Sequence, residues 1–267
     1  MRRDLTTARG LPEPSRAEPS RAEPSRAEPV ALEAAVRPEP FYEDDGVTIY
    51  NADCNEVLPM LAPADVALVL ADPPWGKNER TKRVTAGRVG KGGPTMHPGA
   101  YKAREWEPIH GDDRPFDPAP LLRFPRAVIW GAPYFADKLP PSPSYLIWDK
   151  RDGTTPDDNA DCEIAWSNLG GPARIFRHLW RGLCRASETG VDHLHPTQKP
   201  VALASWILQR WTKPGDLVVD PYMGAGYVAV ACQQLGRRFI GCDLVKHYCE
   251  VTVRRLAQRS LSLGGAA

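Results

Sequence analysis

The sequence predicts an α/β domain built around a mostly parallel sheet. Short, almost continuous apolar runs recur along the chain, a pattern typical of strands covered on both faces. In the C-terminal third these runs alternate with helical periodicity, which indicates a strand–helix–strand–helix unit of the nucleotide-binding type. With 267 residues, 42% of them hydrophobic, the chain can bury one large core or two modest ones.

Five strands are expected in the first two thirds of the chain. They lie in the segments 46–53, 65–72, 126–135, 144–153 and 162–168. The first two, GVTIYNAD and DVALVLAD, each end on an acid. An acid directly after a buried strand is a candidate for chemistry at the edge of the sheet.

The C-terminal third gives the clearest pattern. A helix is expected over 200–211, with Pro200 in its first turn, and a strand over 215–221. A second helix over 227–236 is closed by Gly236. A strand over 237–243 and a helix over 246–259 complete the unit.

The ends of the chain are predicted to be disordered. Residues 14–28 repeat the unit PSRAE three times, and a proline at every fifth position prevents helix propagation while nothing apolar is available to bury. We therefore expect a disordered tail at 1–38, a folded domain at 39–260 and a disordered end at 261–267. Within the domain, the polar stretch 77–122 reads as a long loop insertion with a functional role.

Composition restricts the class of protein. No stretch is apolar enough to span a bilayer, and the N-terminal stretch has no apolar core for a signal peptide, so we expect a cytoplasmic protein without membrane contact. None of the six cysteines forms a C-x-x-C pair, which favours reduced thiols. No metal site is expected, because His195 has only His193 near it at ligand spacing.

A glycine pair indicates a cofactor. Gly224 and Gly226 fall between a strand and a helix, where missing side chains let the backbone approach a ligand; a tight turn alone needs the same residues. Asp243 ends the next strand 19 residues after Gly224, a spacing suited to hydrogen bonds with ribose hydroxyls. The third glycine of the dinucleotide fingerprint is absent, so S-adenosylmethionine, which has no phosphate, fits better than a dinucleotide.

Four motifs carry a resemblance to a known family. In order they are ADPPW (71–75), HPTQKP (195–200), DPYMGAG (220–226) and GCDLVKHY (241–248). Over residues 46–258 the chain resembles the circularly permuted beta group of the DNA amino-methyltransferases, and is similar to small stand-alone members from phages and prophages. The resemblance implies a Rossmann-like methyltransferase fold with a seven-stranded sheet, S-adenosylmethionine as cofactor, and modification of DNA against restriction. Dimers are common among relatives, which leaves a homodimer open.

The resemblance implies a catalytic role for the strand end at 72–75. Asp72 and the Pro73 carbonyl would accept the two N–H bonds of an exocyclic amine, which favours a pyramidal nitrogen with a reactive lone pair. Pro73 and Pro74 would keep this wall rigid, and Trp75 would stack on a base flipped out of the duplex. The alternative is a proline-terminated strand with a core tryptophan.

The resemblance also implies a set of cofactor-binding residues: Asp53, Lys199, Asp220, Pro221, Gly224, Gly226 and Asp243. Lys199 would pair with the methionine carboxylate, Asp220 would face the ammonium, and Asp53 would border the adenine. Two positions depart from the family pattern. Tyr227 stands where relatives usually have threonine, and Asp243 where many have glutamate.

The acid at position 72 favours adenine N6 as the methylated atom, because cytosine N4 enzymes more often carry serine there. Cytosine N4 methylation, RNA adenine methylation and a non-catalytic nucleic-acid-binding descendant are the alternatives. No separate recognition domain is visible, so reading DNA is assigned to the loop 77–122, unless that loop is only a solvated one. Its candidate phosphate contacts are Lys77, Arg80, Lys82, Arg83, Arg88 and Lys91.

Overall fold

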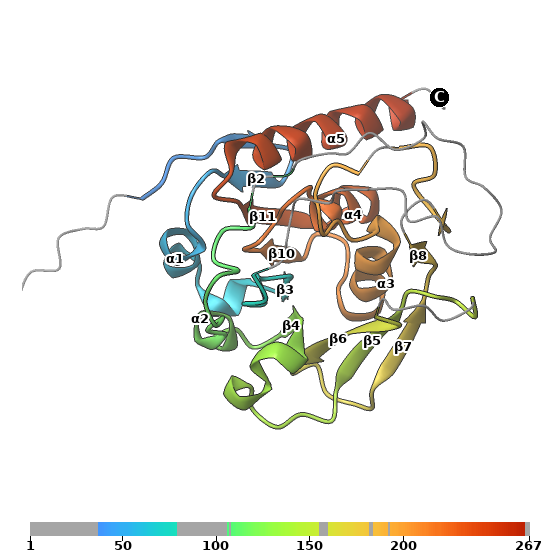
Figure 1. Cartoon of the computed structure of the whole chain (residues 1–267). Helices are drawn as coiled ribbons and strands as arrows, with labels where there is room; N and C mark the ends of the chain where they lie inside the picture. The colour runs from blue at the N-terminus through green and yellow to red at the C-terminus, as the bar shows by residue number, and fades with distance from the viewer. Residues whose placement is uncertain are drawn as a thin grey trace, which may run out of the picture. The chain divides into compact units, whose positions relative to one another are not determined.

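The computed structural model describes residues 37–78, 106, 108–154, 160–181, 184–191 and 193–264. Within these residues nine strands form one sheet in the order β1-β2-β11-β10-β3-β4-β6-β5-β7 (Figure 1). Their bounds are Tyr42–Asp44 (β1), Val47–Tyr50 (β2), Leu68–Ala71 (β3), Ala127–Trp130 (β4), Tyr145–Asp149 (β5), Cys162–Ser167 (β6), Arg174–Arg177 (β7), Leu217–Asp220 (β10) and Arg238–Cys242 (β11). A separate hairpin pairs Trp180–Arg181 (β8) with Cys184–Arg185 (β9).

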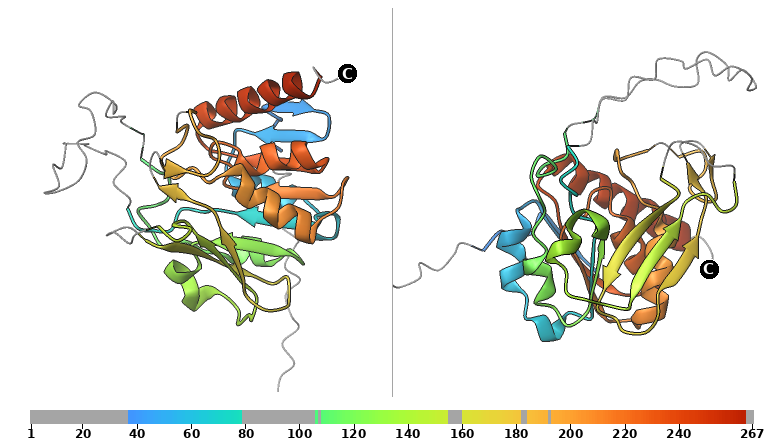
Figure 2. Two further views of the ribbon diagram at one scale, coloured as in Figure 1. Left: turned by 90° about the vertical axis from the view of Figure 1, so that its right-hand side faces the viewer. Right: turned by 60° about the horizontal axis from the view of Figure 1, so that its bottom comes forward.

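Helices cover both faces of the sheet (Figures 1 and 2). The α-helices are Cys54–Val57 (α1), Ala119–Leu122 (α2), Val201–Trp211 (α3), Tyr227–Leu235 (α4) and Lys246–Gly264 (α5), and the 3-10 helices are Leu58–Met60 (η1), Pro63–Asp65 (η2) and Ala132–Lys138 (η3). Helices α3, α4 and α5 share one core cluster with the sheet, and the segments around α1, α2 and η3 share the other. None of the helices in the described ranges combines the length and apolarity that a bilayer crossing requires.

The sheet is mostly parallel, as predicted, but larger than the seven strands that the resemblance implied. The seven strands expected from apolar runs are its inner ones, and β1 and β7 are added at the two edges. These edge strands read YED and RIFR and are mostly exposed. An edge strand has a neighbouring strand on one side only and carries more polar residues, so a search for apolar runs does not reveal it.

The inner strands are continuously hydrophobic because successive side chains point to opposite faces of the sheet and both faces are buried. In β3, Leu68 and Leu70 belong to the cluster with α3 and α4, whereas Val69 and Ala71 belong to the cluster on the other face. All four side chains are fully buried. A strand buried on both faces has no position left for a polar residue until it ends, and β3 therefore reads LVLA and stops on Asp72.

Strand direction gathers the predicted acids at one edge of the sheet. Strands β2, β11, β10, β3 and β4 run parallel, so their carboxyl ends lie together. Strand β6 runs antiparallel between β4 and β5, which brings its first residues to the same edge and sets Glu163 opposite Trp148. This reversal adds a residue from a strand start to a site otherwise made from strand ends.

Some predicted boundaries differ from the structure. The strand expected over 126–135 ends at Trp130, because Gly131 adopts a left-handed backbone with φ +81° and η3 follows. Helix α5 continues to Gly264, past the expected end at 259 and into the predicted disordered end. The tail up to residue 36, residues 79–105 and residues 265–267 lie outside the described ranges.

Candidate active site

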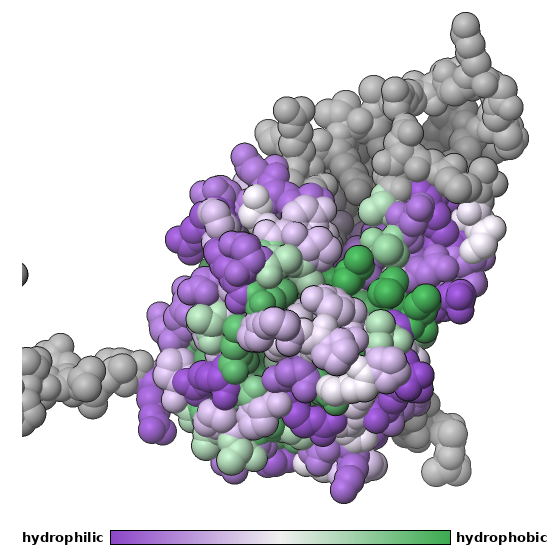
Figure 3. Space-filling view, turned by 90° about the horizontal axis from the view of Figure 1, so that it is seen from below, coloured by the Kyte–Doolittle hydropathy of each residue, from purple (hydrophilic) through white to green (hydrophobic). Residues whose placement is uncertain are grey.

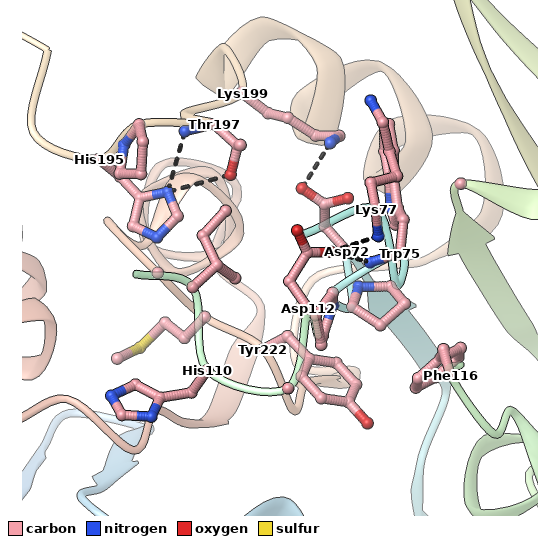
Figure 4. A pocket seen from close by; sticks show the side chains of 18 of the residues that line it. Asp72, Trp75, Lys77, His110, Asp112, Phe116, His195, Thr197, Lys199 and Tyr222 are labelled. Atoms are coloured by element: carbon pink, nitrogen blue, oxygen red, sulfur yellow. Dashed lines mark hydrogen bonds and ion pairs between the residues drawn. The ribbon is translucent and has the colours of Figure 1, made fainter. Parts of the chain in front are cut away.

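A cavity of about 950 Å³ opens at the edge where the strand ends meet (Figure 4). Its lining includes every residue of the predicted catalytic turn and most of the predicted cofactor set. Residues separated by more than a hundred positions, such as Asp72 and Lys199, therefore share one wall. A concave site with convergent polar groups at the carboxyl ends of parallel strands is typical of ligand binding in α/β proteins.

Asp72 follows β3 and presents its two oxygens differently. Oδ2 accepts a hydrogen bond from the Lys199 ammonium, whereas Oδ1 is buried and has no hydrogen-bond partner among the described residues. The indole Nε1 of Trp75, also buried and unpartnered, lies near this carboxylate without completing a hydrogen bond. Burial raises the pKa of Asp72, and Lys199 opposes that rise. The cavity thus contains one acceptor and one donor, side by side, that no described group satisfies.

The turn after Asp72 is held by a carboxylate that the sequence did not single out. Asp112 Oδ1 accepts hydrogen bonds from the backbone N–H groups of Trp75, Gly76 and Lys77 at 3.0, 2.9 and 3.2 Å. Asp112 is 5% exposed. Three donors on one buried oxygen fix the turn that follows the two prolines, so this acid from the 77–122 stretch has a structural role.

Trp75 does not present a bare ring to the cavity. It stacks on Tyr134 of η3 with ring centroids 5.1 Å apart and planes at 17°. The Lys77 ammonium lies 5.4 Å from the Trp75 ring centroid and 5.1 Å from that of Tyr134. Tyr134 is 52% exposed, so the stack ends at solvent. A base that stacks on this face of Trp75 must displace Tyr134.

Lys199 lies in the cavity wall with two ion-pair partners. Besides Asp72, its Nζ is 3.0 Å from Glu163 Oε2, and its side chain is 3% exposed. The prediction assigned Lys199 to a methionine carboxylate; in the structure, two acids of the chain itself engage the ammonium. Glu163 was not among the predicted site residues.

The local fold itself requires the two glycines of the loop. Gly224 and Gly226 have φ values of +50° and +72°. A Cβ at Gly226 would lie 2.4 Å from the Thr252 side chain. Asp243 Oδ2 accepts a hydrogen bond from the Gly224 N–H at 2.9 Å, and Oδ1 accepts one from Val245 at 2.8 Å. The carboxylate predicted to meet a ribose is therefore fixed against the loop.

Asp220, at the end of β10, is fully buried. Its Oδ1 accepts a hydrogen bond from the Tyr222 N–H at 3.1 Å, while Oδ2 has no partner within the described part of the chain. Burial raises the pKa of Asp220 well above its ordinary value. Asp220 is not among the residues that line the cavity, whereas Tyr227, at the start of α4, is; the buried Tyr227 hydroxyl also lacks a partner among the described residues. A cationic group beside Asp220 would favour its ionised form.

Asp53 and His195 also line the cavity. Asp53 caps α1 by accepting from the Asn55 N–H at 2.8 Å. His195 Nδ1 is 3.2 Å from the Thr197 hydroxyl, and its ring packs edge-on against Tyr248. Burial lowers the pKa of His195 to about 4. A neutral imidazole held by its own loop agrees with a role in shaping that loop.

Of the six predicted DNA contacts, only Lys77 lies within the described residues, where it faces Trp75 and Tyr134. Arg80, Lys82, Arg83, Arg88 and Lys91 lie outside them. Three site residues were missed from the sequence: Asp112, Tyr134 and Glu163. Of these three, only Glu163 could have been noticed in the sequence, as an acid at the start of an apolar strand. The edge of the sheet at which it lies depends on the antiparallel direction of β6.

Comparisons with known proteins indicate the class of protein. A family model described as DNA methylase, of the N6/N4 type, matches residues 147–254. The chain is 24% identical over 260 residues to the type II methyltransferase M2.LlaDCHI of Lactococcus lactis subsp. cremoris, and 24% identical over 254 residues to M2.DpnII of Streptococcus pneumoniae. Each alignment covers 82% of this chain and 92% of the relative. The chain is similar to DNA methyltransferases of the N6/N4 type.

The fold of the methyltransferase is shared with a solved relative. The PvuII DNA methyltransferase, which is cytosine-N4-specific, superposes with a TM-score of 0.51 at 13% identity, covering 82% of this chain and 89% of that one. At this identity the likeness concerns the fold alone, and it confirms the predicted methyltransferase architecture.

Proposed function

We propose that this methyltransferase transfers a methyl group to the N6 amine of an adenine flipped out of DNA. One observation carries the proposal: Asp72 Oδ1 is a buried acceptor in the cavity wall, satisfied by nothing in the described structure. A buried unsatisfied carboxylate oxygen is costly and calls for a ligand with a matching donor. The N–H of an exocyclic amine is such a donor.

The residues of the cavity fit S-adenosylmethionine, the cofactor of this group of enzymes. Asp243 lines the cavity beside the glycine loop, where it suits ribose hydroxyls. Asp220 does not itself line the cavity, and its buried Oδ2, unpartnered among the described residues, would act on the methionine ammonium through its charge. Asp53, which also lines the cavity, suits the adenine end. When bound, S-adenosylmethionine supplies a methyl group on a positively charged sulfur.

The free oxygen of Asp72 suits the amine edge of the substrate base. Asp72 Oδ1 accepts a hydrogen bond from the amine of a base stacked against the Trp75–Tyr134 pair. Adenine and cytosine both present this edge, so the choice of adenine rests on the acid at position 72. The Pro73 carbonyl is assigned the second amine hydrogen, which leaves the nitrogen lone pair free for attack.

Tyr134 shares in binding the base. It already stacks on Trp75 and is half exposed at the mouth of the cavity. Base–aromatic stacking stabilises extruded bases. The flipped base therefore stacks against the Tyr134 ring at the exposed end of the Trp75–Tyr134 stack.

One expression experiment tests the reaction and the base. The chain is produced in a host without methylases, and its DNA and RNA are digested to nucleosides for mass spectrometry. We expect N6-methyladenine in DNA with the natural chain and with Asp65→Ala, which changes an exposed acid of η2. We expect none with Asp72→Ala. N4-methylcytosine instead overturns the choice of base, and modification of RNA alone, or of nothing, overturns DNA methylation.

We further propose that the segment 77–122 reads the target. Six cations in its first part, Lys77 to Lys91, suit phosphate contacts, which implies a short or relaxed recognition sequence and a steep loss of affinity with salt. Deleting residues 78–95 should weaken DNA binding in a fluorescence-anisotropy titration while S-adenosylmethionine binding is retained. Unchanged affinity for DNA would contradict this assignment.

A further inference from the structure

A chain of four alternating charges begins at the catalytic acid. Asp72 Oδ2 accepts from the Lys199 ammonium, Lys199 Nζ lies 3.0 Å from Glu163 Oε2, and Lys150 Nζ lies 2.9 Å from Glu163 Oε1. The four residues come from the end of β3, the loop before α3, the start of β6 and the end of β5. Figure 4 shows the innermost link, between Lys199 and Asp72.

Burial strengthens the interactions among these four charged side chains. Exposure of the side chains is 13% for Asp72, 3% for Lys199, 14% for Glu163 and 21% for Lys150. Lys199 is also enclosed by aromatic rings, 5.2 Å from the Trp75 centroid and 5.9 Å from that of Trp130. Charges this far from water interact strongly, and a lone ammonium here would be costly. Lys199 therefore depends on both carboxylates.

The sharing of one ammonium between two acids affects Asp72 in two ways. Lys199 clamps Oδ2 and so leaves Oδ1 as the oxygen that meets the ligand. Glu163 competes for the same ammonium, so Asp72 is only partly neutralised. The clamp supplies orientation, and the competition preserves the basicity of the carboxylate.

We propose that Glu163 is a positioning residue that divides the Lys199 ammonium between two carboxylates and thereby keeps Asp72 both fixed and basic. This inference rests on the proposed function, because it concerns the proton that the reaction releases. The amine gains a carbon–nitrogen bond while the carbon–sulfur bond of the donor breaks, and its electron pair stays on sulfur. The methylated nitrogen then carries an extra proton, which passes to Asp72 Oδ1 and from there to solvent.

The charge chain has a pH signature with a definite sign. Burial raises the pKa of Asp72, Lys199 lowers it, and Glu163 raises it. The other titratable groups that interact with this cluster are Lys150 after β5, Asp220 at the end of β10, Tyr227 on α4 and His195 in the Lys199 loop. Removing the charge of Glu163 should lower the pKa of Asp72. Lys150 partly neutralises Glu163, so removing the charge of Lys150 should raise the pKa of Asp72.

Single-turnover methylation as a function of pH tests this directly. Glu163→Gln should move the acid limb of the rate profile to lower pH and reduce the plateau rate about tenfold, since a weaker base remains. Lys150→Met should move the limb to higher pH, and Glu163→Asp should return it towards that of the natural chain. If Glu163 had a purely structural role, its substitution would slow the reaction, but Glu163→Gln and Lys150→Met would not shift the acid limb in opposite directions. An acid limb at the same pH in the natural chain and all three variants would overturn the proposal.

A second measurement separates this inference from the proposed function. Carboxyl carbons of ¹³C-labelled aspartate are titrated by NMR in the free protein, with Asp72→Asn used for assignment. An Asp72 carboxyl that titrates at lower pH in Glu163→Gln supports the charge chain even if no nucleic acid is methylated. If the natural chain methylates DNA but its Asp72 signal titrates as it does in Glu163→Gln, the inference fails and the proposed function stands.

Discussion

The substitution Gly131→Ala tests whether the turn at 72–75 requires a residue without a side chain at position 131. Gly131 follows β4 with φ +81°, and a Cβ there would lie 2.2 Å from Trp75 Nε1, 2.4 Å from Cδ1 and 2.6 Å from Cε2. These distances are far inside van der Waals contact. The atoms belong to a rigid indole, so the ring can yield only by moving as a whole, away from Tyr134 or into the cavity.

The expected cost has two parts. A left-handed backbone costs alanine about 1–2 kcal/mol, and forcing a methyl group into a packed contact costs about 1–3 kcal/mol more. The matched control is Gly171→Ala, because Gly171 has φ +80° and nothing within 4 Å of its would-be Cβ. The control carries only the backbone cost, so the two variants should differ by about 1–3 kcal/mol.

Urea unfolding gives the two free energies, and near-UV circular dichroism reports the Trp75–Tyr134 stack. We expect Gly131→Ala to lose more stability than Gly171→Ala, to alter the aromatic signal and to slow single-turnover methylation. Binding of S-adenosylmethionine should change less than the rate, because the glycine loop lies on other strands. Equal losses of unfolding free energy in the two variants would refute the reasoning, since Gly131 faces the Trp75 indole and Gly171 faces nothing within 4 Å.

Three other predictions concern the same cavity. Asp112→Ala leaves three backbone N–H groups without their acceptor and should cost about 2 kcal/mol in urea unfolding, whereas Asp112→Asn retains an oxygen and should lose less; equal losses would argue against the carboxylate as the anchor. Tyr134→Ala should weaken the binding of DNA with 2-aminopurine at the target about tenfold, as expected for one lost stacking partner, and Tyr134→Phe should not; a normal fluorescence titration for both would exclude Tyr134 from base binding. Because the pKa of His195 falls from 6.5 to about 4 on folding, the unfolded chain alone is protonated between these values, and stability should decline as pH drops through that window. His195→Gln should flatten the decline of the urea midpoint between pH 6.5 and 4, and an unchanged pH dependence would contradict a buried neutral imidazole.

The exposed large hydrophobic side chains of the described residues are scattered along the sequence. The exposed large hydrophobic residues, Tyr134, Ile175, Val191 and Leu244, come from four separate segments. In the space-filling view from below, apolar and hydrophilic residues both reach the surface (Figure 3). Tyr134 is distinguished from the others by its stack on Trp75 at the mouth of the cavity.

The sequence by itself determined the inner part of the fold and the type of chemistry. Apolar runs locate buried strands because a strand covered on both faces excludes polar residues along its whole length. The same rule marks Asp72 and Asp220 as residues at strand ends. The glycine pair and its spacing to Asp243 depend on local backbone geometry, which short motifs encode. The edge strands β1 and β7 escaped this pattern because they are polar.

Only the tertiary structure decided which groups face one another across the cavity. Lys199 was assigned to a ligand from its motif, but its neighbours Asp72 and Glu163 lie 127 and 36 positions away in the sequence. Glu163 reaches the site because β6 runs against its neighbours, and Asp112 because its loop returns to the turn at Trp75. Electrostatic and hydrogen-bond partners depend on distance in space, and strand direction sets that distance, which no local pattern of residues specifies.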